Sequence, residues 1–254
     1  MTALTRIALA ATCALALGAP TVQALDLGAM TPEERAAFGE AVRDYLLENP
    51  EVILEAVDLL EQKQQEAEAA RDDALVIANL EELQNDGYSW VGGNPEGDVT
   101  LVEFMDYRCG YCRKAAPEIE ALLAADGNIR LVVKEFPILG EASVLSARFA
   151  IATRLVAGDA AYAQVHDTLI ALPGEPSEVA LRRVAEELSL DGEAILARMS
   201  DPEVTEQLQR TRALAQALSI SGTPTFVLEE EMLRGYLPAE QLQIMVDEIR
   251  DARS

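Results

Sequence analysis

The chain has 254 residues, half of them hydrophobic, which suits one large domain or two modest ones with a sizeable core. Its formal charge of −24, from 20 basic and 44 acidic residues, argues against nucleic acid or an anionic membrane surface as a partner. The charge favours solubility and does not name a fold.

The first 24 residues have the pattern of a secretory signal. Arg6 supplies the positive end, residues 7–19 form an apolar stretch, and residues 22–24 (Val-Gln-Ala) make a cleavage site of small residues. The stretch is too short to span a bilayer comfortably, and no second hydrophobic run is long enough for a membrane helix. Cleavage after Ala24 would remove Cys13 and leave two cysteines. We expect an exported, periplasmic protein that works in an oxidising compartment.

Residues 25–85 are predicted to form a helical arm and stalk. A capping box with proline at the first helical position starts the arm at Thr31. Two helices joined at Asn49-Pro50 carry apolar residues at helical spacing, namely Phe38, Val42, Tyr45, Leu46, Val52, Ile53, Val57 and Leu60. The stretch 61–73 is highly polar, and Leu75, Ile77, Leu80 and Leu83 then resume the pattern.

Two short amphipathic helices cannot bury both apolar stripes by themselves. We therefore expect a homo-oligomer, a dimer or trimer, assembled through residues 31–85, with residues 61–73 as a solvated stalk. The alternative is that the stripes pack on the chain's own globular domain, because stripe area alone does not name a partner.

The globular part, residues 86–254, opens with a strand-like run and a pair of cysteines. Residues 101–105 are apolar, and Cys109 and Cys112 stand at the start of a segment with helical periodicity. A helix N-terminus offers unpaired N–H groups and the positive end of the helix dipole, which stabilise a thiolate on Cys109. Cys109 is therefore predicted to attack in disulfide exchange and Cys112 to resolve the mixed disulfide. The intervening Gly110 and Tyr111 are expected to influence the redox potential.

Two other interpretations of the cysteine pair are a structural disulfide and half of a metal site. A short CxxC loop constrains little chain entropy, so its value as a staple is small. A zinc site would need two more cysteine or histidine ligands, and only His166 remains outside the signal segment. The sequence predicts neither a metal nor a cofactor.

Charged residues interrupt the two strands that flank the cysteine helix. Glu103 lies in the first strand and Lys134 in the second, residues 129–136. Parallel neighbouring strands could bring the two side chains together beneath the disulfide, where the pair could carry protons to and from Cys112. The alternative is that one or both reach solvent at strand ends.

Residues 141–220 read as helix after helix, a subdomain rather than a loop. His166 lies in the second of these helices, and a structural or exposed role is expected because nothing pairs it with the cysteines. Thr223 and Pro224 then precede a strand, a turn, a further strand and a closing helix. A proline belongs at the beginning of a core strand, and a cis bond facing the disulfide would leave the Thr223 backbone free to pair with an extended peptide.

From about Trp90 to the C-terminus, this order of elements resembles the DsbA family of thioredoxin-like proteins. The resemblance is carried by Cys109-Gly110-Tyr111-Cys112 together with Thr223-Pro224. It implies an α/β thioredoxin-like fold with an inserted helical subdomain at about 141–220. In that family an acidic residue six positions before the first cysteine and a lysine on the next strand form a buried proton-handling pair, and Glu103 and Lys134 fall on those positions. The resemblance also implies that Gly110, Tyr111, Thr223 and Pro224 contact the substrate.

Two features depart from the family's monomeric oxidases. Those oxidases commonly have Pro-His between the cysteines, whereas Gly110-Tyr111 resembles the dipeptide of the DsbC-type disulfide isomerases. The arm is similar to the oligomerising arm of ScsC- and Com1-like members. We therefore expect an exported thiol-disulfide oxidoreductase of extracytoplasmic proteins, preferably an isomerase or reductase recycled by a membrane redox partner.

The alternatives are a dithiol oxidase and a non-enzymatic binding module. An isomerase needs the cysteine pair kept reduced and an oxidase needs it oxidised, so the redox state in the cell separates them. A holdase chaperone or a copper(I) carrier using two thiolates would not turn over a disulfide substrate.

Overall fold

The computed structural model describes residues 30–254, and the predicted signal segment lies outside the described residues. The chain divides into two compact units, one ending at Glu61 and the other formed by residues 62–254. Helix α2 (Glu51–Ala78) contributes residues to both units. None of the helices within residues 30–254 combines the length and the apolar character needed to cross a membrane.

The first unit contains α1 (Pro32–Glu48) and the beginning of α2. The predicted capping box is present, because the Thr31 hydroxyl accepts from the Glu34 amide at 3.2 Å and the Glu34 carboxylate accepts from the Thr31 amide at 2.9 Å. No residue of α1 is buried. The exposed side chains of this unit include Phe38, Val42, Tyr45, Ile53, Val57 and Leu60.

The second unit is built on a five-stranded sheet in the order β1-β3-β2-β4-β5. The strands are β1 (Trp90–Gly93), β2 (Val99–Met105), β3 (Ile129–Glu135), β4 (Thr225–Leu228) and β5 (Glu231–Arg234). Strands β2 and β3 are parallel, as predicted, and the other neighbouring pairs are antiparallel. Helix α4 (Gly110–Asp126) connects β2 to β3 and places the cysteines at the end of a central strand.

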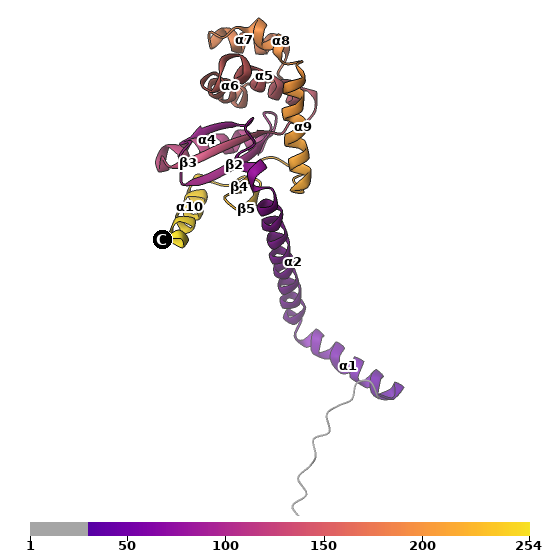
Figure 1. Cartoon of the computed structure of the whole chain (residues 1–254). Coiled ribbons are helices and arrows are strands. Elements are labelled where there is room, and N and C mark those ends of the chain that lie inside the picture. Colours follow the sequence, from indigo (N-terminus) through magenta and orange to yellow (C-terminus); the bar gives the residue numbers. More distant parts are fainter. Residues whose placement is uncertain (1–29) are drawn as a thin grey trace, which may run out of the picture. The chain divides into compact units, whose positions relative to one another are not determined.

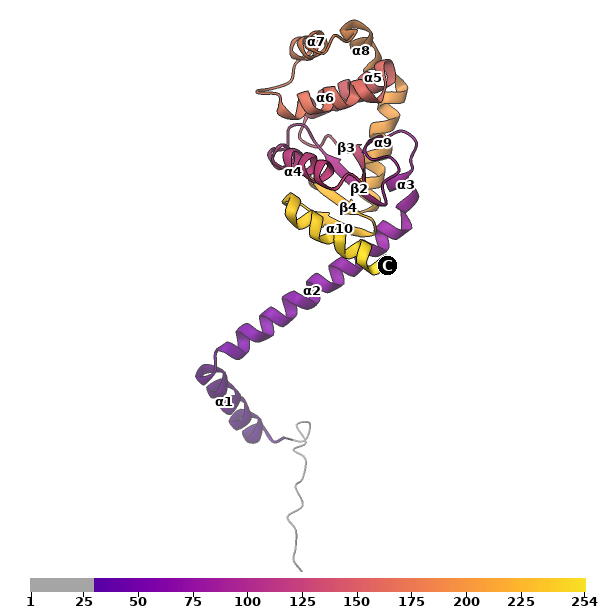
Figure 2. The same ribbon diagram turned by 90° about the vertical axis from the view of Figure 1, so that its left-hand side faces the viewer.

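Helices cover both faces of this sheet, and each strand contributes to two cores because its side chains alternate. On one face Leu101, Leu131 and Phe226 pack with residues of α4 and α10 (Ala239–Arg253). On the other, Val102, Phe104, Val132 and Val227 pack with the end of α2, with α3 (Leu80–Gln84) and with α9 (Pro202–Ala217). The view in Figure 2 shows α4 and α10 side by side, and α10 contacts α4.

The predicted helical insertion is confirmed. It consists of α5 (Glu141–Ala157), α6 (Asp159–Ala171), α7 (Glu178–Glu187), α8 (Gly192–Arg198) and α9. In Figures 1 and 2, α5 to α8 gather beyond the sheet and α9 returns beside it. The insertion is held by apolar side chains that join the first core, among them Phe149, Val165, Leu181 and Ile195.

The last part of α2 packs on the globular unit rather than forming a stalk. Asp72 accepts two hydrogen bonds from the Arg234 guanidinium, each of 3.0 Å, and Val76 is fully buried, as is Leu83 of the following helix α3. Residues 62–71 are exposed, as predicted for a solvated segment. The alternative of packing on the chain's own domain therefore applies from Asp72 onward, and the division at residue 61 differs from the predicted boundary at residue 85.

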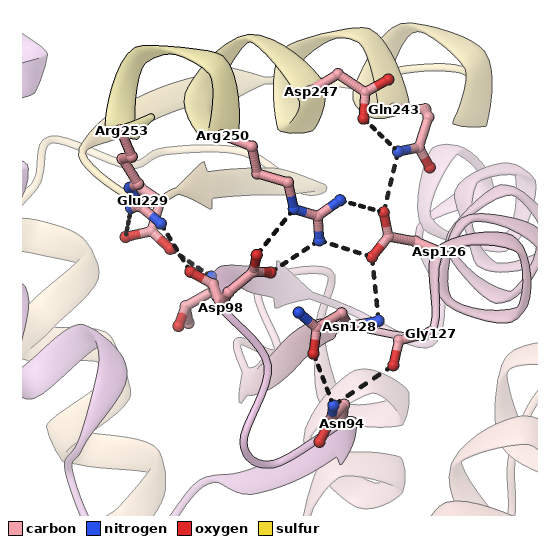
Figure 3. Close-up of polar contacts among 11 residues, drawn as sticks. Asn94, Asp98, Asp126, Gly127, Asn128, Glu229, Gln243, Asp247, Arg250 and Arg253 are labelled. Atoms are coloured by element: carbon pink, nitrogen blue, oxygen red, sulfur yellow. Dashed lines mark hydrogen bonds and ion pairs between the residues drawn. The ribbon is translucent and has the colours of Figure 1, made fainter.

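Helix α10 is tied down by a network of ion pairs at the opposite end of α4 from the cysteines (Figure 3). The Arg250 guanidinium lies between Asp98, in the β1–β2 loop, and Asp126, the last residue of α4, and donates to both carboxylates. These hydrogen bonds hold the pKa of Asp126 well below its usual range, and Gln243 adds another. The network joins three segments that are distant in sequence.

Candidate functional site

Cys109 occupies the N-cap position of α4, directly after a short turn that follows β2. The buried Asp106 fixes this turn. One carboxylate oxygen accepts from the Arg108 amide at 2.8 Å, and the other accepts from the amides of Ile138 and Leu139 at 2.8 and 3.1 Å. The Cys109 amide donates to the Asp106 carbonyl at 3.0 Å. The predicted placement of the first cysteine at a helix start is confirmed.

Thr223 and Pro224 lie against this cysteine, although more than a hundred residues separate them in sequence. The Cys109 thiol donates to the Thr223 carbonyl, with 3.1 Å between Sγ and the oxygen, and the Thr223-Pro224 peptide bond is cis. Strand β4 begins at the next residue and pairs with β2. The β2–β4 pairing therefore sets the distance between the proline loop and the thiol.

Cys112 and Glu103 are buried on the same face of the sheet. Cys112 is only 1% exposed, and burial raises the pKa of its thiol, with the neighbouring Glu103 and Cys109 adding to the effect. Burial also raises the pKa of Glu103 to about 7. Both residues line a cleft of about 450 Å³, which His166 and Asp167 of α6 also line. A carboxyl group that exchanges protons near neutral pH thus lies beside a thiol that must lose its proton to react.

The predicted pairing of Glu103 with Lys134 is wrong. In the parallel register Glu103 lies opposite Val133, and Lys134 lies opposite Phe104. Because neighbouring residues of a strand point to opposite faces, the two side chains lie on different sides of the sheet. Lys134 is therefore remote from the face that carries Cys112, and its catalytic assignment is not supported.

Lys134 is paired with Asp86 instead. Its ammonium group donates to the Asp86 carboxylate at 2.5 Å and to the Glu82 carbonyl at 2.8 Å, and the two side chains are 0% and 3% exposed. Burial opposes the charge on Asp86, but Lys134 and hydrogen bonds from Ser89 hold the pKa of Asp86 below its ordinary value. Sequence reasoning missed Asp86, which precedes Gly87 in an apparently ordinary turn.

A second buried acid lies behind the cysteine turn. One oxygen of Glu135 accepts from the hydroxyls of Tyr107 and Tyr162, at 2.7 and 2.6 Å, and burial raises the pKa of Glu135 to about 8. The Tyr107 hydroxyl also lies 3.1 Å from Nδ1 of His166. These contacts connect the turn of Cys109 to α6. Glu135 was not among the predicted site residues. The sequence feature that could have indicated it is that Glu135 follows Lys134 as a second charged residue at the end of a buried strand.

His166 serves this packing rather than the cysteines. Its ring stacks with those of Trp90 and Tyr162 and lies edge-on to Tyr107. Burial lowers the pKa of His166 to about 4, so the ring is neutral at pH 7. The arrangement agrees with the structural role expected for this residue.

Exposed apolar side chains surround the Cys109 turn. Tyr111, in the CxxC motif, is 64% exposed, and Ile138 and Leu139 of the β3–α5 loop are 39% and 53% exposed. Gly110 leaves open space where a side chain would stand. The surface beside the thiol is therefore one that an extended, partly apolar peptide can approach.

Comparison with known proteins decides the family. A model of the DSBA-like thioredoxin domain matches residues 100–247, which is more than half of the chain. The chain belongs to the DSBA-like thioredoxin family. These proteins are thiol-disulfide oxidoreductases, and the CxxC motif of the family is present here as Cys109 to Cys112. A second model, the N-terminal domain of the copper resistance protein ScsC, matches residues 34–67, so the arm is of the ScsC type.

Solved structures support the same assignment. The chain is 44% identical to a thioredoxin-like oxidoreductase from Silicibacter pomeroyi, with a TM-score of 0.64 over 67% of this chain and 97% of that one. It is 30% identical to BcfH from Salmonella enterica Typhimurium, with a TM-score of 0.71 over 85% and 95% of the two chains. The predicted thioredoxin-like fold with a helical insertion is thus confirmed for this DSBA-like protein.

The curated relatives include a much longer protein. The chain is 31% identical over 156 residues to the Na⁺/H⁺ antiporter NhaA 3 of Salinispora tropica, an alignment that covers 61% of this chain and 24% of the antiporter. The DSBA-like chain spans about a quarter of the length of the first curated relatives it matches.

Proposed function

We propose that this DSBA-like protein is an exported disulfide isomerase and reductase of extracytoplasmic proteins. The observation that carries the proposal is the arrangement of the two thiols. Cys109 Sγ lies at the N-terminus of α4 and faces the Thr223 carbonyl, and the residue is 8% exposed, whereas Cys112 is 1% exposed and lines a cleft with Glu103. We infer that the first sulfur meets the substrate at the surface formed by Tyr111, Ile138 and Leu139, and that the second is withheld from it.

In the first step, the Cys109 thiolate attacks one sulfur of a substrate disulfide. The Cys109–substrate S–S bond forms, the substrate disulfide breaks, and its second sulfur leaves as a thiolate. Cys109 is the N-cap residue of α4, next to the positive end of the helix dipole, both before attack and when it is released. Thr223, Pro224, Gly110 and Tyr111 would hold the substrate backbone and side chains beside the thiol.

Two outcomes follow from the mixed disulfide. If another substrate thiolate attacks the substrate sulfur, a new substrate disulfide forms, Cys109 is released as a thiolate, and no electrons are exchanged overall. If Cys112 attacks Cys109, the pair becomes a disulfide and the substrate leaves reduced by two electrons. Glu103, which lines the same cleft as Cys112, would accept the Cys112 proton in that second route. The raised pKa of Cys112 keeps its thiolate fraction low, which prolongs the mixed disulfide and supports isomerisation.

The arm supports an assembly with several active sites. Its residues up to Glu61 expose apolar side chains on both helices, and the ScsC-type domain covers residues 34–67. We infer that copies associate through this segment as a dimer or trimer, because exposed apolar stripes of this size require cover. The signal-like segment 1–24 supports export to the periplasm, and sustained isomerisation requires a membrane redox partner that keeps the pair reduced.

The test is turnover of a scrambled disulfide protein by the chain without residues 1–24. The wild type should restore activity to the scrambled substrate in a mildly reducing buffer, and Cys109→Ser should abolish this. Cys112→Ser should accumulate the mixed disulfide, which non-reducing electrophoresis detects. Trapping thiols in intact cells should find Cys109 and Cys112 reduced; an oxidised pair would favour the dithiol oxidase.

The copper(I) carrier remains a distinct outcome because the arm matches a domain of a copper resistance protein. A two-thiolate copper site would require Cys112 to be deprotonated, and its burial opposes that. Undiminished turnover by Cys109→Ser would reject the thiol mechanism. Tight copper(I) binding by the reduced pair, without turnover by the wild type, would identify a binding module.

A further inference from the structure

A second hollow, of about 690 Å³, opens between the β3–α5 loop, the start of α5 and the end of α9. It shares no lining residue with the cleft that contains Glu103 and Cys112. Its walls are largely apolar and are formed by Phe136, Pro137, Ile138, Val144, Leu145 and Ile220. We call this hollow the α5–α9 groove.

Two stretches of chain line the α5–α9 groove, 136–148 and 212–221, and each leads to a residue that contacts the Cys109 turn. Ser221 lines the groove and is two residues from Thr223, whose carbonyl accepts from the Cys109 thiol. Ile138, from the other stretch that lines the groove, donates its amide to Asp106, which also holds the turn before Cys109. A chain that crosses the Thr223-Pro224 loop while bound to Cys109 can therefore continue into the groove.

The groove is locally positive in a chain of net charge −24. Arg148 and Arg212 line it, with Glu141 as the single carboxylate among the lining residues. The Arg148 guanidinium already donates hydrogen bonds within the protein, to the Met199 carbonyl and the Thr205 hydroxyl. Arg212 is exposed, and whereas Arg210 on the same helix pairs with Glu82, no carboxylate of residues 30–254 lies within 4 Å of Arg212.

We propose that the α5–α9 groove binds the segment of a protein substrate that flanks its reactive cysteine, and that Arg212 selects segments carrying an apolar and an acidic side chain. The apolar walls would bury the first side chain, and the guanidinium would accept the second in a charge-assisted contact. A protein of net charge −24 repels acidic segments over most of its surface. Arg212 makes the groove a place that attracts them, so that substrates are distinguished by the charge beside their cysteine. This inference rests on the proposed disulfide exchange and names its substrate class.

The experiment uses synthetic peptides with one cysteine joined to 2-mercaptoethanol as a mixed disulfide. One peptide has leucine and glutamate beside the cysteine, a second has leucine and lysine, and a third has serine and glutamate, each prepared with the pair on either side. The second-order rate constant of reduced protein with each peptide is measured by stopped flow. Bis(2-hydroxyethyl) disulfide, which is small and neutral, reports the chemistry alone.

The wild type should prefer the leucine–glutamate peptide. Arg212→Gln should lower its rate constant about tenfold towards that of the lysine peptide, and Arg212→Glu should reverse the preference. The matched control is Arg183→Glu, an exposed arginine of α7 outside the groove that changes net charge equally. Neither change should alter the reaction with bis(2-hydroxyethyl) disulfide.

The outcomes separate the two proposals. If the wild type does not react with bis(2-hydroxyethyl) disulfide, the disulfide-exchange function fails. If it reacts but treats the three peptides alike, or if Arg212→Glu and Arg183→Glu behave alike, the groove assignment is overturned. A change in oligomer mass on Arg212→Glu without a change in peptide preference would make the groove an interface between copies and would also overturn it.

Discussion

At the residue scale, the buried Glu103 is expected to affect both proton transfer at Cys112 and the pH dependence of stability. It lines the same cleft as Cys112, and burial raises its pKa to about 7, so that it can exchange a proton at neutral pH. We expect Glu103→Gln to slow resolution of the mixed disulfide about a hundredfold while the first attack by Cys109 keeps its rate. Single-turnover quenched flow measures the two steps separately. Equal slowing of both steps would mean that Glu103 acts on the fold instead.

The raised pKa of Glu103 also predicts a pH dependence of stability. The unfolded chain ionises this carboxyl near pH 4.5 and the folded chain near pH 7, so its stabilising contribution is complete below 4.5 and is lost as pH rises to 7. Glu103→Gln should therefore gain about 3 kcal/mol relative to wild type between pH 4.5 and pH 8. Urea unfolding of both proteins at both pH values measures their free energies of unfolding. His166, whose pKa is lowered, gives stability the opposite pH trend, and this contribution cancels when the two proteins are subtracted. Glu96→Gln, at an exposed position, should show no such gain.

Lys134 provides the contrast to Glu103. It is buried and paired with Asp86 on the other face of the sheet, so its loss leaves a buried carboxylate unpaired. Lys134→Met should destabilise the protein by about 3–5 kcal/mol in chemical unfolding, and Asp86→Asn in the same chain should restore most of that. The rate of reaction of folded Lys134→Met with a small disulfide should equal that of wild type. A loss of rate in the folded variant would return Lys134 to the catalytic site.

At the scale of the elements, α10 depends on its arginine network (Figure 3). Arg250→Ala removes the partner of Asp126, whose side chain is 3% exposed, and should cost about 2–3 kcal/mol. Ion pairing lowers the pKa of Asp126, so the difference from wild type should be complete above about pH 4 and should shrink as pH falls below it. Thermal unfolding from pH 2 to pH 7 measures this. Arg253→Ala, on the same helix but more exposed, should cost much less.

At the scale of the whole molecule, the residue at which the arm is truncated should decide whether only the oligomeric state or also the thermal stability changes. A chain starting at Gln62 keeps Asp72, Val76 and Leu83, and should fold as a monomer of wild-type thermal stability. A chain starting at Asp86 loses those buried side chains and should melt at a markedly lower temperature, because each large apolar side chain contributes about 2 kcal/mol when buried. Light scattering and calorimetry check both chains. An oligomeric chain from Gln62 would remove the arm from the assembly.

Much of this fold could be predicted because its signals are local. Cys109 at a helix start, the helical run after Glu141 and Pro224 before a strand each depend on a few neighbouring residues. The capping box at Thr31 is equally local. Family resemblance extended these signals to the whole globular unit but assigned Lys134 to the wrong partner.

The sequence by itself determined which residues carry the thiol chemistry and the order of the elements around them. Only the tertiary structure decided what each buried charge faces. Glu103 and Lys134 are separated by strand register, and Asp86 and Glu135 acquire partners distant in sequence. Arg212 lines a groove formed by two stretches that are far apart in the chain, 136–148 and 212–221. The reason is that periodicity and capping act over one or two turns of chain, whereas a buried charge is defined by contacts that exist only after strands have paired.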